Sequence, residues 1–112
     1  MNEEKILIVH HEPDTVDLLR IYLLAQGYQV TIASVEEEAV SACRADLPSA
    51  VLTEAGAGYG LITALRHSPS TGHLPVIFLA DSAEGKLWAL EHGANDFLTM
   101  PVDLRELHLR VR

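Results

Sequence analysis

Two adjacent histidines and a distant glutamate are the residues of this sequence best suited to chemistry. His10 and His11 directly follow the apolar run ILIV, and Glu54 directly follows the short run AVLT. Imidazole and carboxylate groups together bind transition metals, exchange protons near neutral pH, or act as an acid–base pair. Any of these activities requires a fold that brings the ends of the two runs together.

The order of the surrounding segments predicts such a fold. Five short apolar runs alternate with five helix-like segments, and strings such as ILIV and VIFL are typical of parallel strands buried on both faces. We expect strands over residues 5–9, 29–33, 50–53, 75–79 and 96–99. Alternation of this kind predicts right-handed crossovers and a doubly wound parallel sheet with helices on both faces. In such sheets, ligands bind beyond the carboxyl ends of the strands, where residues 10, 11 and 54 stand.

The helical segments carry their own start and stop signals. Pro13 suits a first helical turn, Ser34 with Glu37 matches a capping box, and Asp103 is a suitable N-cap. We expect helices over residues 13–26, 35–46, 61–67, 83–92 and after residue 101. The stretch GAGYG, residues 56–60, lacks the flanking residues of a phosphate-binding motif and predicts a tight, flexible loop.

Size and composition indicate a single domain of 112 residues, with 48% hydrophobic and 21% charged residues. The net charge of −8 argues against nucleic acids and anionic membranes as partners. No apolar run is long enough to span a membrane, and the start MNEEK is unlike a secretory signal. The lone Cys43 excludes an internal disulfide and fits a reducing compartment. We expect a cytoplasmic domain, cut from a longer signalling protein because the sequence stops inside its last helix.

The ordered segments resemble one known family. KILIV..EPD, the passage LL..GY.V..A, LPVIFLA and EHGANDFLTMP together cover nearly the whole chain. In this order they are similar to the receiver domain of two-component response regulators. The resemblance implies a flavodoxin-like (CheY-like) fold with the strand order 2-1-3-4-5.

The same resemblance implies a chemistry whose residues are replaced here. Receivers of this kind take a phosphoryl group from a histidine kinase onto an aspartate after strand three. Two acidic residues after strand one hold Mg²⁺, while a Ser or Thr after strand four and a Lys after strand five bind the phosphoryl oxygens. The matching positions hold His10 and His11, Glu54, Ala80 and Met100, although Pro101 is retained.

These replacements predict a degenerate pseudo-receiver. Neutral imidazoles are poor Mg²⁺ ligands, and neither Ala80 nor Met100 can bind a phosphoryl group. We therefore expect Mg²⁺ binding and ordinary aspartyl phosphorylation to be lost. The expected function is that of a phosphorylation-independent interaction and regulatory module, with no catalytic activity and no cofactor.

Several alternatives remain open for the pocket. The histidines with Glu12 and Glu54 could bind a transition metal. Because adjacent residues on an extended strand point to opposite sides, both histidines reach one ion only if the chain turns at that point. Glu54 could mimic a phosphorylated acceptor, or pair with protonated His10 or His11 in a pH response. Unconventional phosphorylation, local hydrogen bonding in a decayed pocket, and a small α/β enzyme using His11 and Glu54 as acid and base complete the set.

A second candidate surface comprises the fourth helix, fifth strand and fifth helix, which receivers commonly use for dimerisation and output. The spacing predicts that Leu87 and Leu90 point inward. Trp88 lies off that stripe, where it is either exposed or packed flat on its own helix neighbours. In the last helix, the shared face of Leu104, Leu107 and Val111 leaves Leu109 outside it. Trp88, Leu109 and Phe97, which takes the place of the family's switch aromatic, are the candidate contacts. The expected partner is a second copy of the chain or another domain of the parent protein.

Overall fold

A five-stranded parallel sheet with helices on both faces forms the computed structural model, which describes residues 4–80, 83–99 and 103–111, excepting the side chains of 55–59, 83, 84, 86, 104, 108 and 111. The strand order is β2-β1-β3-β4-β5, as the sequence predicts. The strands are β1 (Lys5–Val9), β2 (Gln29–Ala33), β3 (Ala50–Glu54), β4 (Val76–Ala80) and β5 (Asp96–Thr99).

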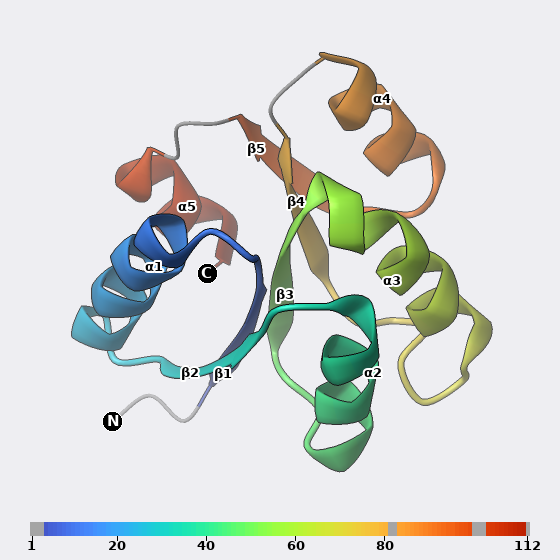
Figure 1. Ribbon diagram of the computed structural model, residues 1–112, viewed down its shortest axis with the longest axis horizontal. Helices are drawn as coiled ribbons and strands as arrows, with labels where there is room; N and C mark the ends of the chain where they lie inside the picture. The colour runs from blue at the N-terminus through green and yellow to red at the C-terminus, as the bar shows by residue number, and fades with distance from the viewer. Residues whose placement is uncertain (1–3, 81–82, 100–102, 112) are drawn as a thin grey trace.

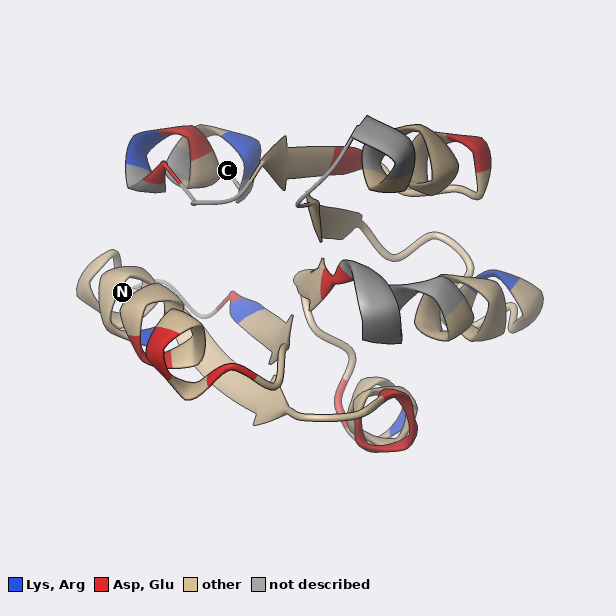
Figure 2. Ribbon diagram, turned by 45° about the horizontal axis from the view of Figure 1, so that its top comes forward, with Lys and Arg blue, Asp and Glu red and all other residues tan. Residues whose placement is uncertain are grey.

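The helices divide between the two faces of this sheet. One face carries α1 (Pro13–Ala25) and α5 (Leu104–Val111), and the other carries α2 (Glu36–Ala45), α3 (Ala55–His67) and α4 (Ala83–Glu91) (Figure 1). The first turn of α2 holds three consecutive glutamates, which the positive end of the helix dipole stabilises (Figure 2). No helix in the described part of the chain is long and apolar enough to cross a membrane.

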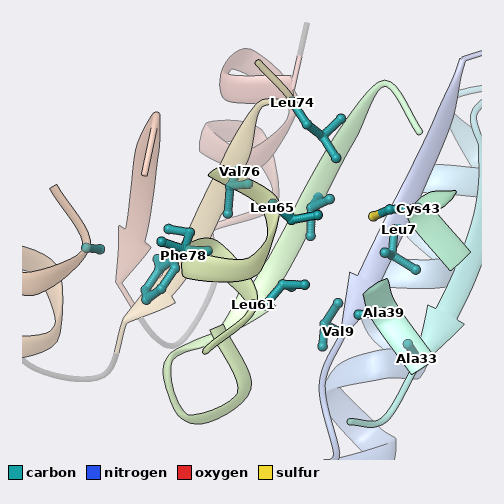
Figure 3. Close-up of a cluster of buried hydrophobic side chains, with 13 residues drawn as sticks. Leu7, Val9, Ala33, Ala39, Cys43, Leu61, Leu65, Leu74, Val76 and Phe78 are labelled. Carbon is teal, nitrogen blue, oxygen red and sulfur yellow. The ribbon is translucent and has the colours of Figure 1, made fainter. Parts of the chain in front are cut away.

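Alternation along each strand creates two hydrophobic cores. Leu7 and Val9 of β1 point toward α2 and α3, whereas Ile6 and Ile8 point toward α1 and α5. Figure 3 shows the first of these clusters, in which Leu61 and Leu65 of α3 lie against the central strands. Burial on both faces explains the uninterrupted apolar runs of the sequence.

Cys43 belongs to the same cluster, where it packs as a small apolar side chain. Its burial raises the pKa of the thiol to about 11, so the nucleophilic thiolate is scarce at neutral pH.

The start of α3 corrects the prediction made for GAGYG. The helix begins at Ala55, directly after β3, so residues 56–60 lie inside its first turns and form no loop. The glycines mislead because glycine usually marks turns. Here the core contacts of Leu61 and Leu65 hold the helix, and a Cβ at Gly60 would collide with the Glu36 carboxylate of α2.

The inward face of α4 also differs from the prediction. Leu87 and Leu90 are 60% and 47% exposed, so their expected inward orientation is wrong. Gly85 and Ala89 are buried instead, and Trp88 packs against the core cluster. Small residues let this short helix approach the sheet, a feature that a search for large apolar residues overlooks.

The start of α2 requires a smaller correction. Val35 is its N-cap and makes no side-chain capping bond, so the expected Ser34–Glu37 box is absent. Glu38 accepts the backbone N–H of Ser34 at 3.0 Å instead. The predicted N-cap of the last helix is confirmed, because Asp103 Oδ1 accepts the N–H groups of Arg105 and Glu106.

A clamp forms at the edge of the sheet where β4 and β5 begin. The Arg66 guanidinium, near the end of α3, donates to the carbonyls of Gly72, Leu74 and Gly93 and to Asn95 Oδ1. Asn95 Oδ1 also accepts the N–H of Val76, the first residue of β4. Arg66 thereby ties α3 to the loops that lead into both strands.

Candidate functional site

Parallel pairing places the ends of three strands at one edge. Val9 is in register with Thr53, and Glu54 is in register with Leu79, the residue before Ala80. The side chains that follow β1 therefore meet the side chain that ends β3. The candidate residues from these distant segments become neighbours, as the sequence predicts for a sheet of this type.

The two histidines lie on the same side of Glu54. Nδ1 of His11 is 2.6 Å from Oε2 of Glu54, and Nε2 of His10 is 3.8 Å from the same oxygen. The imidazole rings are nearly parallel, with centroids 5.5 Å apart. The strand ends at Val9 and the chain bends at His11, which meets the condition that the sequence set for both rings to approach one point.

His10 is the inner member of the pair, with 8% of its surface exposed. Burial is the largest influence on this imidazole and lowers its pKa, which favours the neutral ring. Nδ1 accepts the backbone N–H of Glu12 at 3.0 Å. In the neutral ring the proton therefore sits on Nε2, the nitrogen that faces Glu54.

His11 is the outer member, and its side chain is 74% exposed. Its Nδ1–H donates to the Glu54 carboxylate, which is itself only 16% exposed. Glu54 is the N-cap residue of α3 but makes no side-chain capping bond, so its carboxylate is directed at the histidines. Hydrogen bonding to a carboxylate fixes the orientation of the His11 ring.

Glu12 serves a different purpose from the one considered for it. Its Oε1 accepts the N–H of Asp14 and caps α1, with Pro13 at the first helical position. The structure therefore excludes it from the cluster formed by His10, His11 and Glu54. The sequence carries part of this signal, because Pro13 favours the first helical position and thereby makes the residue before it the N-cap.

The structure describes one of the three remaining predicted pocket positions. Ala80 ends β4, is completely buried and brings no hydroxyl group to the site. Met100 and Pro101 lie outside the described residues.

The predicted output residues are also located. Trp88 is half-buried and stacks on His92 with ring centroids 4.0 Å apart. Phe97 is half-buried against the same core, while Leu109 is 65% exposed. The exposure of Leu109 and the burial of Leu107 match the predicted faces of α5.

Comparison with known proteins decides the family. The model of the response regulator receiver domain matches residues 6–112. The chain belongs to this family. A protein of Leptolyngbya boryana, described as an uncharacterized 14.6 kDa protein in the sodA1 3′ region, is 40% identical over 91% of this chain and 82% of its own length. The response regulator PleD of Caulobacter vibrioides is 33% identical over 96% of the chain, which spans only 25% of PleD.

A solved structure gives the same answer for the fold. A protein from Chloroflexus aurantiacus, assigned as a response regulator, superposes with a TM-score of 0.93 at 31% identity, covering 98% of this chain and 95% of that one. Receiver domains are signalling modules of two-component-type proteins. The chain therefore has the frame of a signalling domain, with His10, His11 and Glu54 together at its carboxyl edge.

The cluster of His10, His11 and Glu54 does not fit the magnesium ion that the family implies. Mg²⁺ requires near-octahedral oxygen ligands. Among the described residues, the cluster offers one carboxylate and two imidazoles, and the Glu12 carboxylate is occupied at the start of α1. Two imidazoles with a carboxylate match the ligand preferences of Zn²⁺, Ni²⁺ or Cu²⁺ instead.

Proposed function

We propose that this receiver domain acts as a regulatory interaction module that does not depend on phosphorylation of an acidic residue. The observation that carries the proposal is the contact between Glu54 and the two histidines. Glu54 ends β3, where the family resemblance places the phosphoacceptor, and its carboxylate already accepts the Nδ1–H of His11 at 2.6 Å.

The surroundings of Glu54 support this proposal. Phosphoryl transfer to a carboxylate needs cations and hydrogen-bond donors that offset the charge on the transferring oxygens. Burial lowers the pKa of His10 and favours its neutral ring. The side chain of Ala80 has no hydrogen-bond donor, and Met100 stands where the family resemblance implies a lysine. A nucleophile in this setting has little stabilisation of its transition state.

A direct test measures phosphorylation itself. The protein is incubated with a small phosphodonor and Mg²⁺, and its intact mass is recorded at intervals. We expect an unchanged mass. A mass increase of one phosphoryl group that disappears in Glu54→Gln would overturn the proposal, and an increase that disappears in His11→Gln would indicate unconventional phosphorylation on histidine.

The partner that we propose is a second copy of the chain, bound through the fourth helix, fifth strand and fifth helix. Leu87 and Leu90 of α4 and Leu109 of α5 are exposed, and β5 is an edge strand between these helices. Exposed leucines on the two helices flanking an edge strand offer the apolar centre that a stable interface needs.

Light scattering after size-exclusion chromatography tests this surface. We expect a dimer that dissociates in Leu87→Glu and in Leu109→Glu. The matched control is Leu47→Glu, because Leu47 is 47% exposed but lies after α2. A monomeric parent protein, or a dimer that survives both interface variants, would reject this surface. Trp88→Ala separately tests the half-buried tryptophan, which we expect to affect stability more than association.

A further inference from the structure

We propose that His10, His11 and Glu54 form a binding site for a divalent transition-metal ion, for which Zn²⁺ is the best match in ligand chemistry. This inference goes beyond the interaction function and does not rest on it. The three residues each present a ligand atom, and these atoms all lie within 4.8 Å of one another. Two imidazoles and one carboxylate are an established ligand set for zinc with an open coordination position.

Small movements convert the present geometry into a coordination sphere. Ligand atoms bound tetrahedrally to zinc lie roughly 3.4 Å from one another. The 2.6 Å separation between His11 Nδ1 and Glu54 Oε2 must therefore widen, and the 3.8 Å separation between His10 Nε2 and the same oxygen must shrink. These two changes are each smaller than about 1 Å, and the two histidine nitrogens, within 4.8 Å of each other, must approach by up to about 1.4 Å. The His11 side chain, 74% exposed, has room to move.

The protonation states of His10 and His11 also suit metal binding. A metal replaces the proton of each ligand nitrogen, so neutral imidazoles bind best. Burial lowers the pKa of His10 and keeps its ring neutral near pH 7. The proton on His11 Nδ1 now lies between that nitrogen and Glu54, which is the position that the ion would take.

The hydrogen bond from the Glu12 N–H to His10 Nδ1 must break when a metal binds, and NMR can follow its loss. When Nε2 of His10 binds an ion, the ring proton moves to Nδ1, which then cannot accept the N–H of Glu12. A bond of this kind is worth about 1 kcal/mol, far less than the binding free energy of a structural zinc ion. The amide resonance of Glu12 should consequently shift when the metal binds.

Binding would change the properties of the domain at a defined place. The ion would connect His10 and His11, which follow β1, to Glu54, which ends β3. These segments are more than 40 positions apart in the sequence. Because the unfolded chain does not bring these ligands together, a bound ion would raise the stability of the folded state. The domain would thereby respond to the availability of metal.

The decisive experiment is a titration of the intact protein with Zn²⁺, Ni²⁺ and Mg²⁺, followed by calorimetry and thermal unfolding. We expect one equivalent of Zn²⁺ to bind and to raise Tm, with no effect of Mg²⁺ at equal concentration. Cobalt(II) provides an optical readout, because its visible absorption reports imidazole ligands and a low coordination number.

Matched variants assign the ligands. His11→Gln and Glu54→Gln should each weaken Zn²⁺ binding by roughly 10–100-fold. His73→Gln is the control, because His73 is an exposed histidine in the loop before β4 and should leave binding unchanged. His11 is exposed, so its replacement leaves the fold intact and keeps the test valid even if a variant of buried His10 is unstable.

Three results would overturn the proposal. They are Zn²⁺ binding weaker than about 1 mM in the parent protein, equal binding by the parent protein and His11→Gln, and a Glu12 amide resonance that does not move when Zn²⁺ saturates the protein. None of these outcomes depends on phosphorylation, so they leave the mass measurement above as a separate test of the proposed function.

Discussion

Two polar clusters lie at opposite edges of the same sheet and are built differently. At the edge where β4 and β5 begin, Arg66 donates five hydrogen bonds, four to main-chain carbonyls and one to Asn95. At the carboxyl edge, His11 and Glu54 bond to each other, and His10 accepts a single main-chain N–H.

We infer from this difference that the Arg66 cluster contributes mainly to stability and that the cluster of His10, His11 and Glu54 is free to bind a ligand. Arg66 donates to carbonyl groups in the loops before β4 and β5, and its loss leaves the part-buried acceptors of Gly72 and Leu74 without this donor. Glu54 and His11 satisfy one another beside solvent, and either partner can be exchanged without exposing the main chain. We expect substitutions at the first cluster to lower stability, and substitutions at the second to change binding.

The largest effect is expected for Arg66→Gln. Loss of the charged donors should lower the free energy of unfolding by about 2–3 kcal/mol, measured by urea denaturation. The control is Arg20→Gln, because Arg20 forms an exposed pair with Asp17 on α1 and should change stability by less than about 0.5 kcal/mol. Equal stabilities of the two variants would remove the contrast between the clusters.

An intermediate effect is expected for His10→Gln. His10 is buried and gives up one accepted hydrogen bond, so the unfolding free energy should fall by about 1 kcal/mol. His73→Gln is the exposed comparison and should remain close to the parent protein. A loss at His10 as large as the loss at Arg66 would show that the carboxyl edge also contributes to the framework.

The smallest effect on stability is expected for His11→Gln. The side chain is mostly exposed, so unfolding in metal-free buffer should change by less than about 0.5 kcal/mol. The same variant should nevertheless lose the rise in Tm that Zn²⁺ produces in the parent protein. A marked destabilisation without metal would contradict the division between framework and site.

The strands were predictable because parallel sheets bury both faces. Three of the five strands have the predicted bounds, β3 extends one residue further to Glu54, and β4 is shifted by one residue to Val76–Ala80. The helix signals at Pro13 and Asp103 also act as expected, because their effects on the backbone are local. Of the predicted pocket positions, His10 and His11 follow β1, Glu54 ends β3 and Ala80 ends β4, as the sequence predicts.

What the sequence did not predict depends on packing over longer distances. Glycines at 56–60 favour a loop, yet the core contacts of the following turns extend α3 back to Ala55. The orientation of α4 depends on buried Gly85 and Ala89, which carry little hydrophobic signal. The approach of His10 and His11 follows from the bend after Val9, which a period-two pattern does not contain.

The central claim is that the frame of a receiver domain persists here without its phosphorylation chemistry. It is tested most directly by restoring the family residues in this chain through His10→Asp, His11→Asp, Glu54→Asp, Ala80→Thr and Met100→Lys. Both proteins are treated with a phosphodonor and Mg²⁺, and their intact masses are compared. We predict that only the restored protein gains one phosphoryl group, and a gain of equal extent in the parent protein would contradict the account.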